Sequence, residues 1–150
     1  MTAPETDLLN EHAAIECSLS LLSSAVDSND DCHDLQCIWS HVECLLLDHI
    51  RTEEQELFGL VAPAHRAEVE ALRAEHQYIR RALLELGVQV ELHAVRKPQV
   101  DELVAFLRGH AERENQTLYR WLVERPDALL ANIVHRMIER RAHDNERRAS

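Results

Sequence analysis

The chain has 150 residues, a length that fits one domain with a hydrophobic core of its own. Hydrophobic residues make up 45% and charged residues 29%, with only 3 Gly and 4 Pro, a balance typical of a mainly helical protein and not of a disordered or fibrous one. The formal net charge of −11 argues against a general nucleic-acid binder and against docking on anionic lipid, because both would repel the protein.

Apolar residues recur at helical spacing through most of the chain, and no stretch alternates like a strand. The first expected helix covers about residues 6–28, with Thr6 as its N-cap, and a polar cluster then ends it. The second helix covers about residues 33–60. Pro63 separates it from a third helix that ends near residue 93.

The fourth expected helix covers about residues 98–125, with Pro98 in its first turn. Pro126 opens a fifth helix, whose apolar stripe is Leu130, Ile133, Val134, Met137 and Ile138. This series predicts an all-α fold, an up-down-up-down antiparallel four-helix bundle with an additional C-terminal helix. We therefore divide the chain into residues 1–125, the bundle, and residues 126–150, a helix and tail that pack on the bundle or extend from it.

The two halves of the chain repeat the same motifs. Residues 8–19 and 72–83 both read L-x-x-E-H-x-x-I-x-x-x-L. Residues 46–58 and 107–119 both read L-x-x-H-x-x-x-E-x-Q-x-L, followed by an aromatic residue. The sequence therefore resembles two copies of a helical hairpin closed face to face.

Each half contributes one lone histidine on an apolar helix and one histidine followed four residues later by a glutamate. Residues four apart share one face of a helix, so each His/Glu pair can present an imidazole and a carboxylate to one point in the interior. Buried charge is costly, and metal coordination is one of the few arrangements that offsets the cost. We therefore predict six metal ligands: His12, His49, Glu53, His76, His110 and Glu114.

Two carboxylates shared by four imidazoles suit a dinuclear centre, in which Glu53 and Glu114 bridge two ions and two histidines complete the protein ligands of each. This arrangement leaves room for an oxo or hydroxo bridge and an open coordination position. Imidazole and carboxylate ligands are compatible with iron, manganese or zinc, and bridging carboxylates in a helical bundle favour two iron ions. The alternative is a set of buried polar residues satisfied by hydrogen bonds, which would not explain why six such residues repeat in register.

Other polar residues are expected to have lesser roles. Glu16 is interpreted as a flanking or ion-pair residue, because Arg80 occupies the matching place in the second half. Tyr78 and Tyr119 can supply a proton or a hydrogen bond to bound oxygen species, although packing is the favoured role for both. The remaining histidines are expected to be structural, in the case of His41, or exposed: His33, His65, His93, His135 and His143. An apolar sleeve is expected around the ligands, made of Leu45, Leu46, Leu57, Phe106, Leu107 and Leu118.

With this H…HxxxE…H…HxxxE series, and LF or LY after each glutamate, the sequence from about Leu8 to Val123 resembles the hemerythrin-like, or HHE cation-binding, family. The resemblance implies an up-down four-helix bundle around a non-haem di-iron centre, with the six residues above as ligands. Oxygen-carrying hemerythrins have a further histidine where this chain has Arg80, and usually place the last carboxylate five residues after its histidine rather than four. These departures argue against reversible oxygen transport.

The symmetric ligand set looks more like that of the iron-centre repair proteins linked to nitric oxide stress, and like that of stand-alone bacterial hemerythrin-like proteins. The repair proteins carry an additional cysteine-containing N-terminal domain that this sequence does not contain, so we do not carry the repair role over. The leading hypothesis is a di-iron protein that binds or reacts with O2, NO or H2O2 in oxidative or nitrosative stress or iron handling. If it is an enzyme, it would consume peroxide or nitric oxide.

The alternative hypothesis is a non-catalytic iron or oxygen sensor, or an iron store, that signals through the C-terminal helix to a partner or a second copy in a homodimer. A purely structural bundle is the third possibility. No signal peptide or membrane span is evident, so a cytoplasmic location is expected. The cysteines have no C-x-x-C spacing and are expected to be reduced thiols that do not bind metal: Cys17, Cys32, Cys37 and Cys44.

Overall fold

The structure is a computed structural model that describes residues 4–28 and 32–125, together with isolated positions between 132 and 149. Within these ranges the chain is helical apart from short connections and contains no strand, so the all-α fold is confirmed. None of the helices described is long and apolar enough to cross a membrane. The apolar stripe of the predicted fifth helix lies outside the described residues, and the division into residues 1–125 and 126–150 stays a prediction.

The helices follow the predicted order. They are α1 (Pro4–Asp27), α2 (Cys32–Thr52), the π-helix η1 (Glu53–Leu57), α3 (Phe58–Glu91), α4 (Lys97–Gln116) and α5 (Leu118–Val123). The first helix begins at Pro4 and not after Thr6, which agrees with the preference of proline for a first helical turn. Helix α4 begins as predicted, and the backbone amide of Arg96 donates to the side chain of Gln99 (2.9 Å).

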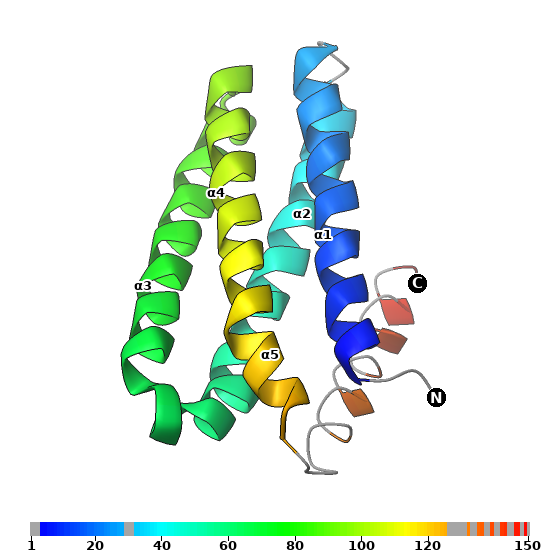
Figure 1. Cartoon of the computed structure of the whole chain (residues 1–150). Helices are drawn as coiled ribbons and strands as arrows, with labels where there is room; N and C mark the ends of the chain where they lie inside the picture. The colour runs from blue at the N-terminus through cyan, green and yellow to red at the C-terminus, as the bar shows by residue number, and fades with distance from the viewer. Residues whose placement is uncertain are drawn as a thin grey trace.

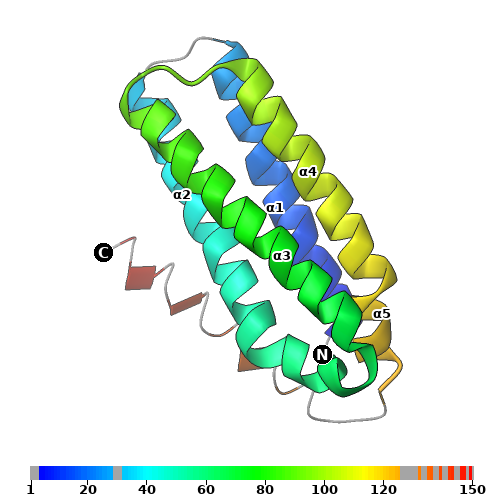
Figure 2. The ribbon, with the colours of Figure 1, turned by 90° about the vertical axis from the view of Figure 1, so that its left-hand side faces the viewer.

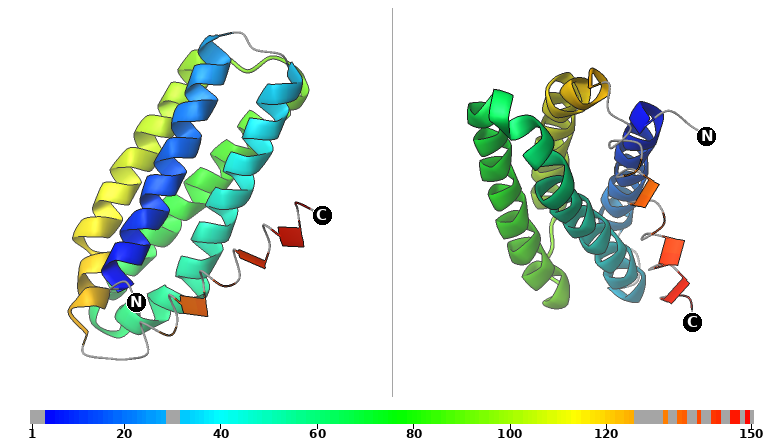
Figure 3. Two further views of the ribbon diagram at one scale, coloured as in Figure 1. Left: turned by 90° about the vertical axis from the view of Figure 1, so that its right-hand side faces the viewer. Right: turned by 90° about the horizontal axis from the view of Figure 1, so that it is seen from below.

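The four long helices lie side by side, with α1 and α3 each packed against both α2 and α4 (Figures 1 and 2). The turn between α3 and α4 lies at the same end as the last turn of α1, whereas η1 lies at the opposite end (Figure 2). Seen along their length, the helices surround a common interior (Figure 3). This interior holds the side chains discussed below.

Two helix breaks differ from the prediction. The chain passes from α2 through η1 directly into α3, and the bend lies at His65 (φ −133°, ψ 39°), two residues after Pro63. The helix predicted over residues 98–125 is interrupted at Thr117 (φ −119°, ψ −83°), where α4 ends and α5 begins. The Thr117 hydroxyl donates to the carbonyl of Arg113 (2.7 Å), a side-chain bond that competes with regular helical bonding. The break at Thr117 comes three residues after Glu114, and the π-helix η1 begins at Glu53, so a predicted ligand lies at or just before each of these irregularities.

The hydrophobic core has two parts, one on either side of the predicted ligands along the helices. The larger cluster includes Leu22 and Leu83, both almost fully buried, and extends toward the α3–α4 turn. The smaller cluster, near η1 and α5, is built around Phe58, Leu72 and Leu118. The ligand-type residues therefore form a polar layer between two apolar regions.

Candidate metal centre

The structure brings all six predicted ligands together. His12 comes from α1, His49 from α2, Glu53 from η1, His76 from α3, and His110 and Glu114 from α4. Their ligand atoms form two overlapping groups, each with all atoms within 4.8 Å of one another. The first group is His12, His49, Glu53 and Glu114; the second is Glu53, His76, His110 and Glu114. The two carboxylates belong to both groups, which is the arrangement that a pair of bridged ions requires.

Glu53 faces a histidine of each half. Its Oε1 lies 3.1 Å from Nε2 of His49, and its Oε2 lies 3.3 Å from Nε2 of His76. Glu114 reaches the other two histidines through Oε1, at 2.7 Å from Nε2 of His110 and 3.9 Å from Nε2 of His12. All four imidazoles therefore turn Nε2 toward the carboxylates.

Burial makes this cluster costly without a further partner. Glu53, His76 and Glu114 are fully buried. Among the described residues, Oε2 of Glu53 and both carboxylate oxygens of Glu114 are buried and make no hydrogen bond of normal geometry, although Oε2 of Glu53 and Oε1 of Glu114 lie close to imidazole nitrogens. An unsatisfied buried polar atom costs about 1–3 kcal/mol, and more when it is charged. Cations between the carboxylates would satisfy these oxygens, so the residues present fit a metal centre.

The electrostatics of the cluster support the same conclusion. Burial, together with the charge of Glu53, raises the pKa of Glu114 well above its ordinary value. Burial alone would also raise the pKa of Glu53, but the charge of His49 and surrounding hydrogen bonds hold it well below the ordinary value. Against burial, the charge of Glu53 and the bonds to Glu11 and Glu53 raise the pKa of His49 well above 6.5. Protons on His49 and Glu114 thus occupy the place of positive charge that bound cations would take.

Each imidazole also has an acceptor on its outer nitrogen. The acceptor fixes a proton on Nδ1, so the neutral form of each imidazole carries its lone pair on the inward-facing Nε2, the tautomer that a metal ligand uses. The four pairs are His12 with Asn115 (3.1 Å), His49 with Glu11 (2.8 Å), His76 with Glu54 (3.0 Å) and His110 with Glu75 (2.5 Å).

Sequence reasoning missed these outer partners, although the repeat contains the signal. Glu11 and Glu75 directly precede His12 and His76, and each bonds the paired histidine of its own half. Glu54 and Asn115 directly follow the ligand glutamates, and each bonds the lone histidine of the other half. A neighbour of a ligand is rotated by about 100° around its helix, which turns it to the adjacent helix.

Tyr119 is also part of the site, so the packing role predicted for it is incomplete. Its buried hydroxyl donates to Oε1 of Glu53 (2.6 Å) and lies 2.9 Å from Nε2 of His12. Burial and the charge of Glu53 raise its pKa well above 10, so the phenol keeps its proton. Phe58, the matching residue in the first half, stacks on His76 (5.3 Å between ring centroids). Tyr78 is instead partly exposed and packs against Phe106, as predicted.

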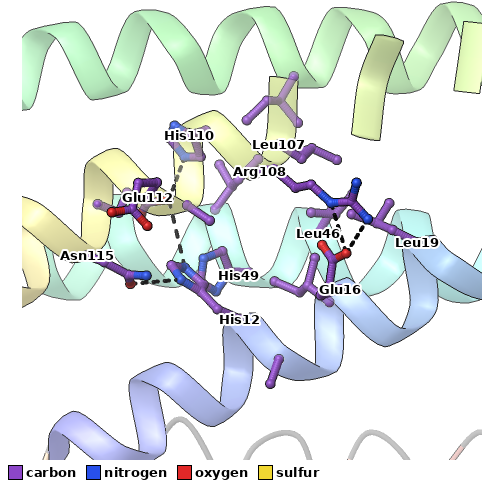
Figure 4. A pocket seen from close by; sticks show the side chains of 16 residues that line it. His12, Glu16, Leu19, Leu46, His49, Leu107, Arg108, His110, Glu112 and Asn115 are labelled. Atoms are coloured by element: carbon purple, nitrogen blue, oxygen red, sulfur yellow. Dashed lines mark hydrogen bonds and ion pairs between the residues drawn. The ribbon is translucent and has the colours of Figure 1, made fainter. Parts of the chain in front are cut away.

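A cavity of about 270 Å³ reaches the ligands between α1 and α4 (Figure 4). Its inner wall includes His12, His49, His110 and Glu114, and its apolar wall consists of Ile15, Leu19, Leu46, Ile50, Ile79 and Leu107. Leu46 and Leu107 are thus placed as the predicted sleeve requires, whereas Leu57 and Leu118 belong to the smaller core cluster. At the mouth, Glu16 pairs with Arg108 (2.9 Å), which confirms the ion-pair role predicted for Glu16.

The other histidines and the cysteines lie apart from this cluster. His65 was predicted to be exposed, but it is half-buried and stacks on Trp121 with ring centroids 3.5 Å apart, because the bend in α3 turns it toward α5. His41, His93, His135 and His143 are exposed, while the side chain of His33 lies outside the described residues. The cysteines whose side chains are described, Cys17, Cys37 and Cys44, are free thiols. None of them belongs to the groups that can hold a metal.

Comparison with known proteins agrees with the geometry. The family model described as the hemerythrin HHE cation-binding domain matches residues 3–122, a span that contains all six candidate ligands and their outer partners. Searches of curated proteins and of solved structures gave no match. Since the match covers most of the chain, the protein belongs to the hemerythrin HHE cation-binding domain family.

Proposed function

We propose that this protein is an up-down-up-down four-helix bundle that holds two iron ions and binds or reacts with a small neutral molecule such as O2, NO or H2O2. Glu53 and Glu114 would be shared by the two ions, His12 and His49 would hold one ion, and His76 and His110 would hold the other. The observation that carries the proposal is the pair of overlapping ligand groups that share both carboxylates. Iron suits this set of imidazole and carboxylate ligands, and manganese or zinc are the alternatives.

The iron pair would supply electron transfer and an open coordination position for the small molecule. The protein residues would hold the ions in place through the inward-facing imidazole nitrogens. Tyr119, whose hydroxyl lies between His12 and Glu53, holds a proton beside the site and can donate it in a hydrogen bond. The apolar wall of the cavity limits the access of water.

The cavity also indicates the kind of molecule that reaches the site. It exposes His12, His49 and His110 but not His76, which Phe58 covers. The cation at the mouth, Arg108, is paired with Glu16, and Glu112 adds a further negative charge to the lining. An apolar passage with an acidic mouth favours small neutral molecules over anions.

The test measures iron content and the turnover of H2O2 and NO in wild type, in a ligand variant and in a control variant. Iron-loaded wild type is expected to contain two ions per chain and to consume H2O2 or NO. The double variant His49→Ala/His110→Ala should lose both the iron and the turnover, because each ion loses one of its two histidines. His41→Ala, an exposed histidine on the same helix as His49, is the matched control and should change neither. Equal turnover in wild type and double variant would remove the catalytic interpretation, and absence of stoichiometric metal would remove the di-iron proposal.

The alternative to a protein that consumes the small molecule is a non-catalytic iron or oxygen sensor, or an iron store. For residues 126–150 we propose packing on the bundle, with docking of a partner or a second copy as the alternative. Deleting residues 126–150 tests this, because an unchanged fold with lost association would support the docking role. Localisation in the cytoplasm likewise stays a proposal.

A further inference from the structure

We infer that the two metal positions differ in affinity, and that the difference between Glu54 and Asn115 sets the order in which they fill. The position formed by His76 and His110 fills first, and the position formed by His12 and His49 holds the weaker, exchangeable ion. This inference rests on the proposed two-ion centre and adds an order of loading to it.

The first step is that the paired histidine of each half has a carboxylate as its outer partner. His49 is bonded to the carboxylate of Glu11, and His110 to the carboxylate of Glu75. Both carboxylates are contributed by the residue before a lone histidine. Arg113 also bonds Glu75 (2.5 Å) and so adds to the anchoring at His110. The larger difference between the two positions lies at the lone histidines.

The second step is that His76 has a carboxylate on its outer nitrogen. Glu54 accepts from Nδ1 of His76 (3.0 Å), and Arg80 holds Glu54 in place with two bonds of 2.9 and 2.8 Å. A carboxylate partner raises the basicity of a metal-binding imidazole and fixes its ring. His76 is also fully buried and covered by Phe58, so its ring is closely confined.

The third step is that His12 has only a neutral partner. Asn115, the residue that matches Glu54, bonds Nδ1 of His12 through its amide oxygen (3.1 Å). Glu16, which stands where the second half has Arg80, is paired with Arg108 at the cavity mouth. His12 also lines the cavity and keeps 10% of its side chain exposed.

These differences all act in one direction. The ion at His76 and His110 gains an anionic, anchored outer partner and a closed apolar cover, and the ion at His12 and His49 has neither at its lone histidine. Outer partners of metal-binding histidines change metal affinity by about 10–100-fold, which is sufficient to separate the two binding steps. A form with a single ion, held at the position formed by His76 and His110, is therefore expected to be populated.

The experiment is an anaerobic titration of the metal-free full chain with Fe²⁺ in competition with a chromophoric chelator. Wild type should show two steps whose dissociation constants differ by at least about tenfold. His12→Ala should remove the weaker step and His76→Ala the tighter one, which assigns each step to its position. A single step of two equal ions, or the reverse assignment, would overturn the inference while leaving the two-ion centre intact. Failure to bind two ions at all would overturn both proposals.

Two exchanges at the matched positions test the cause. Asn115→Asp should strengthen binding in the weaker step, and Glu54→Gln should weaken binding in the tighter step. Each exchange should therefore reduce the ratio of the two dissociation constants by at least about fivefold. Glu112→Gln is the control, because it removes a charge from the cavity lining without bonding a histidine, and should change the ratio less than about twofold. An unchanged ratio in both exchanges, or an equal change in the control, would contradict the assigned cause. Asn115→Asp preserves the size of the side chain. If Glu54→Gln does not fold, the titrations of Asn115→Asp and of wild type are sufficient to test the assigned cause.

Discussion

The ligand layer and the apolar clusters on either side of it are buried to a similar degree, but different forces stabilise them. In the larger cluster, side chains such as Leu22 and Leu83 are buried among other apolar groups, which is favourable by itself. In the layer, Glu53 and Glu114 are fully buried with oxygens that lack hydrogen-bond partners among the described residues. The apolar clusters are therefore self-sufficient, whereas the layer depends on positive charge supplied by protons or by metal ions.

Removal of the metal should affect the layer most strongly. With free Fe²⁺ held about 1,000-fold above the dissociation constant, each ion adds about 4 kcal/mol to the free energy of unfolding. We expect the chelated protein to lose at least this amount while remaining helical, because both apolar clusters are intact. Chemical unfolding followed by circular dichroism, with and without iron, measures the difference. Equal stability of the two forms would show that the layer does not depend on cations.

A core substitution should show the opposite behaviour. Leu83→Ala leaves a cavity in the larger cluster and should lower the free energy of unfolding by about 3 kcal/mol. Because Leu83 lies outside the ligand groups, the loss should be the same in the metal-free and the iron-loaded protein. Leu84→Ala, at a neighbouring exposed position, is the matched control and should have little effect. A loss that depended strongly on iron would mean that the two regions are coupled.

The dependence of stability on pH should also differ between the metal-free and the iron-loaded protein. The pKa values of His49 and Glu114 are raised in the folded protein. The stability that this contributes is complete below their unfolded pKa values of 6.5 and 4.5, and it is lost as pH rises through their folded pKa values. Glu53 has a lowered pKa, so its contribution is lost only at acidic pH. His12, whose pKa is lowered to about 4, is neutral in both states above pH 6.5.

Metal-free protein should therefore become less stable as pH rises above 6.5, by an amount on the order of 1 kcal/mol for each pH unit. Iron-loaded protein should not, because cations then replace the protons and bind better at higher pH. Urea unfolding of the metal-free and the iron-loaded protein over this range of pH measures how the free energy of unfolding of each depends on pH. A metal-free protein that gained stability over this range would contradict the proposed protonation of the layer.

The smallest effect is expected from truncation. Residues 4–125 contain both apolar clusters and all six candidate ligands, so a chain ending at Arg125 should fold and bind two ions with affinities close to those of the full chain. Metal titration of the two proteins side by side tests this expectation. A truncated chain that failed to fold would show that residues 126–150 complete the core.

The repeated, periodic features of the sequence were sufficient to predict the all-α fold and the convergence of the six ligands. The spacing of four between His49 and Glu53, and between His110 and Glu114, fixes the face that each pair shares. The lone histidines His12 and His76 could be placed because their flanking leucines and isoleucines form the core stripe. These patterns could be interpreted from the sequence because they depend on residue spacing within a single helix and not on packing between helices.

Features that depend on packing between helices could not be predicted. The π-helix at Glu53 and the break at Thr117 replace regular bonding just where ligands are aimed inward, and no glycine or proline marks either position. Glu11 and Glu75 bond histidines of a neighbouring helix, so their partners depend on which helices pack side by side. The stacking of His65 on Trp121 similarly follows from the bend in α3.

A crystal structure of the protein grown and purified under iron-replete conditions, with anomalous scattering recorded at the iron edge, tests the central claim most directly. Two peaks are expected, one between His12 and His49 and one between His76 and His110, with Glu53 and Glu114 in contact with both. A single peak that persists when the crystals are soaked in excess Fe²⁺, or six side chains joined only by hydrogen bonds with no metal between them, would contradict the account.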